Sequence, residues 1–323
     1  MTDIIRTHSC PICLLCGTAG EILYTELADK LFSAPGVWQI KRCPQKDCGL
    51  LWLDPMPEEG DLPLIYETYY THQDKPTVAR GLARQIARGA YHALLRATGL
   101  AYQRSELFSL YLRGVKPGRL LDVGCGDGRH LAHWETMGWK VEGQEVDATA
   151  AERARGHHGL HVHVGVLPDL ALPGSVFDVV TMNHVIEHVP DPLALLQESH
   201  RLLKPGGKLI AVTPNVNSLG HHRFGRCWRG LEPPRHLHLF SPTTLDHLGV
   251  QAGFHSVRTS TTAANAQFLA EASLCIAHTG QYRSGARVGW VVAIQSLLFQ
   301  FRAMTAHFAR RDSGEECVFS AVK

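Results

Sequence analysis

Three glycines spaced two residues apart lie in the stretch Asp122-Val123-Gly124-Cys125-Gly126-Asp127-Gly128. The stretch follows an apolar run and precedes residues with helical spacing, so it is expected to turn from a strand into a helix. Glycine lets a backbone approach a ligand closely, and a helix N-terminus offers free N–H groups and a positive dipole end. We therefore expect Gly124, Cys125, Gly126 and Gly128 to cradle an anionic group.

The glycine spacing selects among the cofactors that such a turn can bind. A dinucleotide-binding loop reads GxGxxG, whereas this loop reads GxGxG with an acid, Asp122, two positions before the first glycine. No Lys-Ser or Lys-Thr follows the glycines, as it would in a phosphate-binding P-loop. The pattern favours S-adenosylmethionine, whose methionine carboxylate would be the anionic group.

A second acid, Glu145, lies at the end of the next apolar run. A carboxylate there can accept hydrogen bonds from both ribose hydroxyls, as the acid beyond the second strand does in dinucleotide folds. The alternative is that a helix begins at Asp147 and that Glu145 is exposed to solvent.

Histidines are the candidates for the proton transfer that methylation of an OH or NH group requires, because their pKa lies near neutrality. His236 and His238 lie in a His- and Arg-rich segment, residues 228–241, that follows the fifth expected strand. We expect His236 to be the base, with His238 and His184 as competitors. Each could instead be packed or solvated, and Arg235 could bind a substrate anion or pair with Glu232.

Four cysteines have the spacing of a zinc site. Cys13 and Cys16 form one pair and Cys43 and Cys48 a second, and each pair is followed by a glycine. Thiolates are strong zinc ligands, and four protein ligands leave no open position, so the metal is expected to be structural. Cys10 offers a competing register with Cys13, but that pair lacks the following glycine.

The residues His184-Val185-Ile186-Glu187-His188 match the HxxEH pattern of inverted zinc proteases. They directly follow an expected strand, and Pro190 and Pro192 interrupt any helix, so the protease interpretation is poor. We expect His184 to lie over the cofactor and Glu187 and His188 to have structural roles.

The candidate site residues described above are positioned by an alternation of strands and helices. From residue 116 onward, short apolar runs are separated by helical stretches, which is typical of a parallel sheet with helices on both faces. Seven strands are expected, over residues 119–123, 140–144, 160–164, 177–182, 208–213, 254–260 and 316–322. The fold class is therefore α/β, with residues 1–75 forming a zinc-ribbon-like module, 76–115 a helical linker or cap, and 116–323 the cofactor-binding domain.

The order of motifs resembles the class I, Rossmann-like S-adenosylmethionine-dependent methyltransferases, especially the ubiquinone-biosynthesis-like branch. The motifs are residues 122–128, Glu145, Phe177-Asp178-Val179-Val180, Glu187-His188-Val189-Pro190-Asp191-Pro192 and Leu202-Leu203-Lys204-Pro205-Gly206-Gly207-Lys208-Leu209. The resemblance covers residues 115–323 and implies a seven-stranded sheet whose last hairpin is reversed. Related enzymes often hold the adenine with an acid after the third strand, and this chain has none there. Backbone groups of Val166 or Leu167 are expected to replace it, and Asn183 is a further candidate contact.

The resemblance also extends to the N-terminal part of the chain and to the loop at residue 184. Many bacterial small-molecule methyltransferases look similar at the N-terminus, with paired zinc knuckles followed by a Tyr-rich stretch such as Tyr66-Glu67-Thr68-Tyr69-Tyr70. Those tyrosines would either reach the active site or pack between module and domain. The related branch can carry a Glu, Glu, His metal site, but His184 replaces the first Glu here.

Composition limits the remaining choices. The 323 residues are 45% hydrophobic and carry a net charge of +2, which gives no strong field for nucleic acid. No apolar signal segment precedes the first cysteines, so a cytoplasmic protein is expected. Residues 288–301 are too few to form a membrane-spanning helix. They should form a buried helix, and the alternative is a helix at a membrane interface.

The leading hypothesis is an O-, N- or C-methyltransferase acting on a sugar, a polyketide-like or a lipid-linked intermediate. The alternatives are a ribosomal or transfer RNA methyltransferase and a non-catalytic cofactor-binding scaffold. The near-neutral charge and the lack of an Asn-Pro-Pro-Tyr type motif argue against RNA, and the intact glycine loop argues against a scaffold. The sequence leaves the acceptor and the oligomeric state open.

Overall fold

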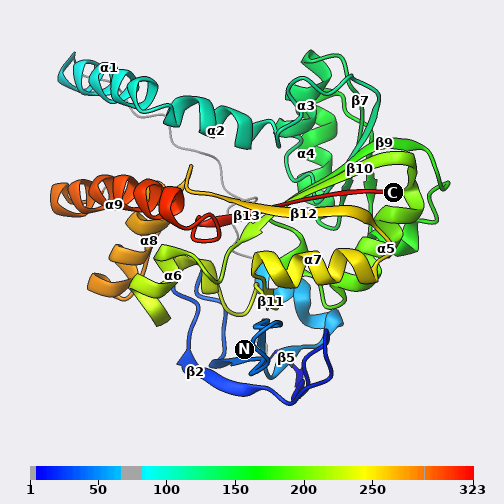
Figure 1. The fold of residues 1–323 in the computed structure, drawn as a ribbon, viewed down its shortest axis with the longest axis horizontal. Coiled ribbons are helices and arrows are strands. Elements are labelled where there is room, and N and C mark those ends of the chain that lie inside the picture. Colours follow the sequence, from blue (N-terminus) through cyan, green and yellow to red (C-terminus); the bar gives the residue numbers. More distant parts are fainter. Residues whose placement is uncertain (1–4, 67–81, 287) are drawn as a thin grey trace.

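A seven-stranded sheet organises the larger part of the molecule (Figure 1). In the computed structural model, which describes residues 5–66, 82–286 and 288–323, its order is β12-β13-β10-β9-β6-β7-β8. The strands are β6 (Arg119–Val123), β7 (Lys140–Glu145), β8 (Val162–Val164), β9 (Phe177–Asn183), β10 (Leu203–Pro214), β12 (His255–Thr262) and β13 (Glu316–Val322). Strand β13 runs antiparallel to both of its neighbours, β10 and β12. The expected seven strands and reversed last hairpin are confirmed.

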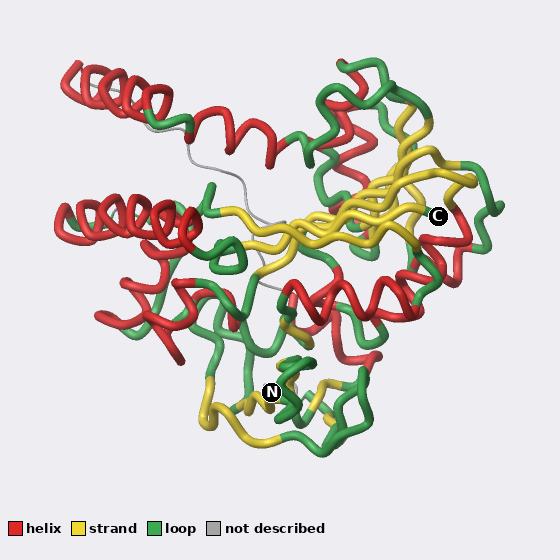
Figure 2. Tube along the Cα trace, viewed as in Figure 1, coloured by secondary structure: helices red, strands yellow, loops and turns green. Residues whose placement is uncertain are grey.

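Helices cover both faces of this sheet (Figure 2). Alternate residues of β6 contribute to opposite faces, because side chains alternate along a strand. Leu120 shares a buried cluster with Leu131 and Trp134 of α3 (Arg129–Thr136). Leu121 lies in the other cluster, which includes residues of α5 (Pro192–Leu202) and α7 (Pro242–Gln251). Full burial of each leucine stabilises the fold by about 1.5–3 kcal/mol.

The remaining helices connect or extend these layers. They are η1 (Glu59–Tyr66), α1 (Leu82–Ala97), α2 (Leu100–Phe108), α4 (Ala148–His158), η3 (Leu167–Leu170), η4 (Ile186–His188), α6 (Leu219–Phe224), η5 (Gly225–Cys227), η6 (Arg229–Leu231), α8 (Ala266–Thr279) and α9 (Trp290–Ala309). Helices α8 and α9 are inserted between β12 and β13. The expectation that residues 288–301 form a buried helix is correct for one face only, because Phe299 is buried while Trp290 and Leu298 are exposed. None of the described helices is long and apolar enough to cross a membrane.

The N-terminal module has a small sheet that the larger domain completes. Its strands are β1 (Thr7–His8), β2 (Glu21–Leu27), β3 (Trp38–Arg42), β4 (Leu51–Leu53) and β5 (Met56–Pro57). The four-stranded sheet has the order β11-β4-β3-β2, and β11 (His238–Leu239) comes from the segment after β10. His238 pairs with Trp52 and Leu239 with Leu51. The module and the domain therefore share a sheet, although the paired strands β4 and β11 lie nearly two hundred residues apart in the chain.

A buried ion cluster fastens the same interface. The guanidinium of Arg235 lies 2.8 and 2.9 Å from the two carboxylate oxygens of Asp29, and its Nε donates to Glu232 at 2.9 Å. The side chains of Arg235 and Asp29 are fully buried. The plane of Arg235 also covers the ring of Phe32. Of the two roles expected for Arg235, the structure supports pairing with Glu232 and leaves no exposed surface for a substrate anion.

Removal of this guanidinium should strongly destabilise the fold. The Arg235→Ala variant leaves Asp29 buried without its counter-charge, while Glu232 retains only Arg229, which should lower the free energy of unfolding by about 3–5 kcal/mol. Urea denaturation followed by circular dichroism measures this loss. Arg201→Ala, which removes a half-exposed ion pair with Glu198, is the matched control and should cost less than about 1 kcal/mol. Equal losses in the two variants would contradict the assignment.

Candidate functional site

The glycine loop turns sharply between β6 and α3. Gly124, Gly126 and Gly128 all have positive φ, at 66°, 55° and 77°, a conformation that residues with a Cβ rarely adopt. A Cβ at Gly128 would clash with Ala154 and Leu160, and one at Gly124 would meet Val185. A Cβ at Gly126 would meet nothing within 4 Å. The loop is thus packed against other residues at Gly124 and Gly128, and there is open space in front of Gly126.

The amides of this loop are paired within the protein. Gly124 N donates to the Gln144 side chain at 3.2 Å, and Cys125 N to the Gln144 carbonyl at 3.0 Å. Gly126 N donates to Glu145 Oε2 at 2.8 Å. An anionic ligand that uses these amides would therefore replace Glu145 at Gly126 or bind beside it.

Glu145 lies against the loop, as expected, and only 8% of it is exposed. Its second oxygen accepts from Asp147 N at 3.0 Å, and burial raises the pKa of its carboxyl. Asp147 also caps α4 through Thr149 N, so the helix start that the alternative interpretation expected is present. The exposed Glu145 of that alternative is not.

Two further loop residues have their side chains beneath the turn. Asp122 is buried and accepts a hydrogen bond from Thr181 Oγ1 at 2.7 Å, and burial raises its pKa to about 7. Cys125 packs against Gly143, where an added Cβ would lie 2.6 Å from its Sγ. Burial raises the pKa of the Cys125 thiol. With its thiol buried and its N–H paired to the Gln144 carbonyl, Cys125 remains a predicted cofactor contact.

The expected adenine and methyl contacts surround the loop at the carboxyl ends of the strands. Val166 is exposed and Leu167 is buried at the start of η3, while Gly165 N donates to the Glu145 carbonyl at 3.0 Å. Asn183 is the half-buried last residue of β9. That Val166, Leu167 and Asn183 contact the cofactor remains a prediction.

His184 follows Asn183 and is held between two carboxylates. Its Nδ1 lies 3.0 Å from Glu187 Oε1, and its Nε2 lies 3.0 Å from Glu316 Oε1. Partial burial lowers the pKa of His184, but the two carboxylates together raise it to about 10. The imidazole is therefore a cation at neutral pH, with 37% of its side chain exposed at the edge of the loop.

His236 and His238 do not join this group. His236 is 3% exposed, its Nδ1 donates to the Gly230 carbonyl at 2.8 Å, and burial lowers its pKa to about 3. His238 is 2% exposed within β11, and burial lowers its pKa to about 4. The strand pairing of β11 with the module explains their burial. The expected ranking, with His236 first and His184 a competitor, therefore has no support from the geometry.

His236 instead lies beside Glu187 and His188. One ligand atom of each of these three residues lies within 4.8 Å of the others. Glu187 Oε2 is buried and has no hydrogen-bond partner among the described residues. The Nδ1 atoms of both histidines face backbone carbonyls, which leaves each Nε2 as a lone-pair donor. This set of one carboxylate and two imidazoles fits a divalent cation, and His184 is not part of it.

The tyrosine-rich stretch is described only at its first residue. The hydroxyl of Tyr66 lies 2.9 Å from His188 Nδ1, so it packs between module and domain. Tyr69 and Tyr70 lie outside the described residues.

Four site residues were missed by the sequence analysis: Gln144, Tyr111, Asn265 and Glu316. The side-chain amide of Asn265 donates to Glu316 Oε2 at 3.2 Å. Burial raises the pKa of Tyr111, and the charge of Glu316 adds to the effect. Glu316 opens the reversed strand β13, so it lies where the parallel strands end, and its acidic type at that position was the available signal.

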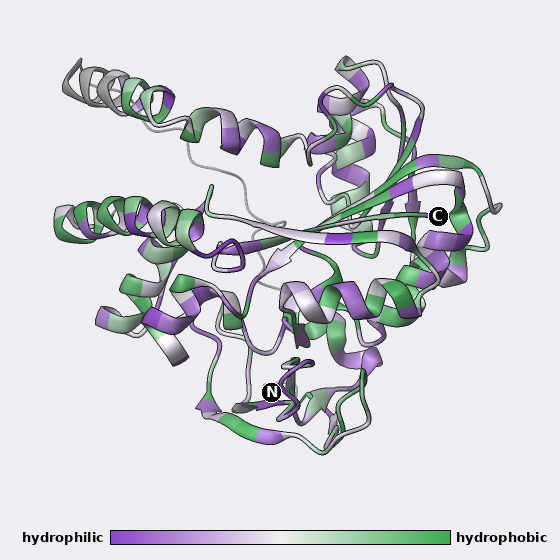
Figure 3. Cartoon of the chain, viewed as in Figure 1, coloured by the Kyte–Doolittle hydropathy of each residue, from purple (hydrophilic) through white to green (hydrophobic). Residues whose placement is uncertain are grey.

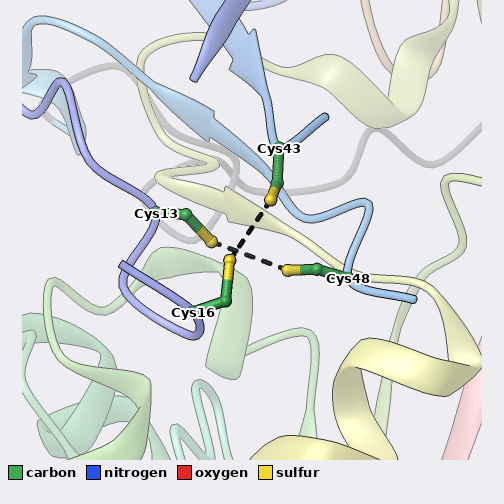
Figure 4. Close-up of side chains that lie close together, drawn as sticks. All are labelled: Cys13, Cys16, Cys43 and Cys48. Atoms are coloured by element: carbon green, nitrogen blue, oxygen red, sulfur yellow. Dashed lines mark hydrogen bonds between the residues drawn. The ribbon is translucent and has the colours of Figure 1, made fainter. Parts of the chain in front are cut away.

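The four cysteines converge in the module (Figure 4). Cys13 Sγ lies 3.6 Å from Cys48 Sγ, and Cys16 Sγ lies 3.4 Å from Cys43 Sγ. Tetrahedral zinc with bonds of about 2.3 Å separates its sulfur ligands by about 3.8 Å, so the cluster fits the ion. Cys10 lies outside the cluster, and its amide donates to Asp54 Oδ1.

The two knuckle glycines have the conformation that the zinc site needs. Gly17 and Gly49 have φ of 70° and 63°, and Gly17 N donates to the Cys13 carbonyl at 2.9 Å. These turns point the thiols of each pair toward the other pair. The preference for Cys13 over Cys10 in the first pair agrees with this geometry.

We expect the purified chain to contain zinc that depends on this cluster. Cys43→Ser should lose the ion and unfold at a lower temperature, because the ion cross-links two knuckles of a small module. Elemental analysis by mass spectrometry together with thermal unfolding measures both effects. Cys10→Ser and Cys227→Ser are the controls and should retain the metal. A Cys43→Ser protein that retains the ion, or loss of the ion from the two control variants, would refute the site.

Comparison with known families identifies the fold. Residues 94–259, just over half of the chain, match a family described as a methyltransferase domain. The chain belongs to the class I, S-adenosylmethionine-dependent methyltransferase family. The glycine loop, Glu145 and His184 all lie inside the matched methyltransferase region, whereas the cysteine cluster lies outside it.

Individual relatives share part of this methyltransferase. The ubiquinone biosynthesis O-methyltransferase of Cereibacter sphaeroides is 40% identical over 104 residues, which cover 31% of this chain and 42% of the relative. The malonyl-[acyl-carrier protein] O-methyltransferase of Serratia marcescens is 29% identical over 173 residues, covering 53% and 65%. The chain thus spans less than two thirds of the length of these relatives. A solved methyltransferase from Thermotoga maritima, described as a possible histamine N-methyltransferase, is 22% identical with a TM-score of 0.47, covering 73% of this chain and 95% of that one.

Proposed function

We propose that this protein transfers a methyl group from S-adenosylmethionine to an oxygen, nitrogen or carbon of a small molecule. A single observation carries the proposal. A side chain added at Gly126 would meet nothing within 4 Å, so there is open space in front of this residue and beside Glu145, whereas Gly124 and Gly128 of the same loop are packed against other residues. The substrate class is a sugar, a polyketide-like or a lipid-linked intermediate. The relatives named for ubiquinone biosynthesis and for malonyl-[acyl-carrier protein] act on oxygen, which favours an O–H acceptor here.

The cofactor would be held by the loop and its neighbours. Glycine amides would meet its carboxylate, and Glu145 would accept hydrogen bonds from the ribose once it leaves Gly126 N. Asp122, buried beneath the turn, would orient the loop through Thr181. Backbone groups at Val166 and Leu167 would contact the adenine, and Asn183 would lie beside the methionine part. When bound, the cofactor supplies a methyl group on a cationic sulfur.

Proton removal is assigned to the pair formed by His184 and Glu316. Both ring nitrogens of His184 are engaged by carboxylates and its pKa is about 10, so the histidine already holds a proton at neutral pH. The group that can accept the proton of the methyl acceptor is then the Glu316 carboxylate, with His184 and Asn265 orienting it. His236 and His238 are placed second, because the Nδ1 of each faces a backbone carbonyl, that of Gly230 for His236 and that of Val189 for His238, and burial lowers the pKa of both.

The two competing functions are separated by simple binding tests. An RNA methyltransferase would be retained on RNA in a salt-dependent manner, because phosphate contacts release counterions. A scaffold protein would bind the cofactor and yield no methylated product. Treatment of a cell extract with the protein and isotopically labelled cofactor, followed by mass spectrometry, should reveal a labelled small molecule.

The assignment of Glu316 predicts a specific loss of rate. With the acceptor found in that experiment, Glu316→Gln should lower kcat about 100-fold or more, because an amide cannot accept the proton. Cofactor binding should change little, because the side-chain partners of Glu316 are His184 and Asn265 and not the glycine loop. Initial rates and calorimetry measure the two quantities.

The neighbouring Glu315→Gln variant is the matched control for this loss. Burial raises the pKa of Glu315 to about 8, so its carboxyl is largely neutral and an amide imitates it. Glu315→Gln should therefore keep most of the rate. A Glu316→Gln enzyme with unchanged kcat would exclude the carboxylate as the base.

A further inference from the structure

Helix α9 exposes an apolar face. Trp290, Ile294 and Leu298 follow each other at intervals of four residues and are 76%, 51% and 55% exposed. Val291 and Phe308 extend the same face and are 44% and 77% exposed. Residues spaced in this way form one stripe on a helix, so the exposed side chains make a single surface. We call these five residues the outer face of α9.

The opposite side of α9 is already occupied by the protein. Phe299 and Ala303 are buried in a cluster with Ala266 and Ala270 of α8. Gln300 fixes the helix further, because its side chain donates to the Ala263 carbonyl at 2.7 Å. The hydropathy view shows α9 as one of the most apolar helices on the surface, extending beyond the sheet (Figure 3). A helix that is apolar all round is normally covered on every side, so the outer face has the character of a binding surface.

Positive charge surrounds the outer face. Residues 281–311 contain no aspartate or glutamate. Arg283 precedes the helix, Arg302 lies at the edge of the outer face, and Arg310 follows the helix, and all three are exposed, although Arg310 forms an exposed ion pair with Asp312 at 3.4 Å. Arg302 forms no ion pair within the described part of the chain. The charges therefore favour an anionic partner, and a second copy of α9 would instead bring like charges together.

We propose that the outer face of α9 binds the surface of a membrane that contains anionic lipid. Tryptophan and phenylalanine are suited to the boundary between headgroups and acyl chains, and arginines near an anionic surface attract it. The helix would lie in the interface on its apolar side while α8 supports it from behind. The proposal concerns membrane association and does not depend on methyl transfer.

The buried side of α9 connects the helix to the candidate site. The Gln300 side chain also accepts from Gln267 N at 2.9 Å, and Asn265, two residues earlier, donates to Glu316.

Vesicle sedimentation with the full chain tests the proposal. The protein should pellet with vesicles of phosphatidylcholine and phosphatidylglycerol in equal parts, and much less with phosphatidylcholine alone or at high salt. Trp290→Ser/Leu298→Ser should lower the partition coefficient at least about tenfold, because two buried apolar side chains are lost from the interface. Ile22→Ser/Val250→Ser removes two exposed apolar residues elsewhere and should bind like the wild type.

Three outcomes would overturn the proposal. They are no pelleting with anionic vesicles, equal pelleting of the two double variants, and a dimer in analytical ultracentrifugation that only the α9 variant dissociates. The last result would assign the outer face to a second copy of the chain. Because all four mutated residues are exposed, circular dichroism and the unfolding temperature should remain close to wild type and establish that the variants fold.

Discussion

Between β6 and α3 the chain reverses within five residues, and it can do so because Gly124, Gly126 and Gly128 lack a Cβ. Val185 packs against the first glycine and Ala154 against the third, so the loop is fixed from two sides. The side chains of Gln144 and Glu145, on the neighbouring strand, then accept hydrogen bonds from the amides of the loop. The site is thus a backbone shape held by packing and by acceptors on β7, and the side chains around it depend on that shape.

A second constraint ties the module to the domain. Strand β11 extends the module sheet, and Arg235 is buried between Asp29 and Glu232. Breaking such a buried ion pair strongly destabilises the fold, because either partner left alone is an uncompensated charge. The ion cluster therefore keeps the N-terminal module in a defined place beside η4, where Glu187 and His188 lie.

The parts of the structure that follow from local pattern were predictable. The seven strands have the apolar runs of a parallel sheet, and the glycine loop has its spacing, so both are identified by residues close together in the chain. The cysteine pairs belong to the same class, because each knuckle is a short turn closed by a glycine.

Contacts between distant segments were not predictable in the same way. The run containing His236 and His238 looked like a substrate loop, yet it is drawn into the module sheet by pairing with β4. Glu316 is distant from His184 in sequence and meets it only because β13 is reversed. The pKa of His184 follows from that meeting, so its role as a base could not be judged from the residue type.

Isothermal titration calorimetry with S-adenosylhomocysteine tests the central claim most directly. The wild-type chain should bind the compound, whereas Gly126→Val should bind at least about tenfold more weakly, because its side chain would fill the open space and strain a residue at φ 55°. Gly156→Ala, in a helix where an added Cβ meets nothing, should bind as the wild type does. No binding by the wild type, or equal binding by Gly126→Val, would contradict the account.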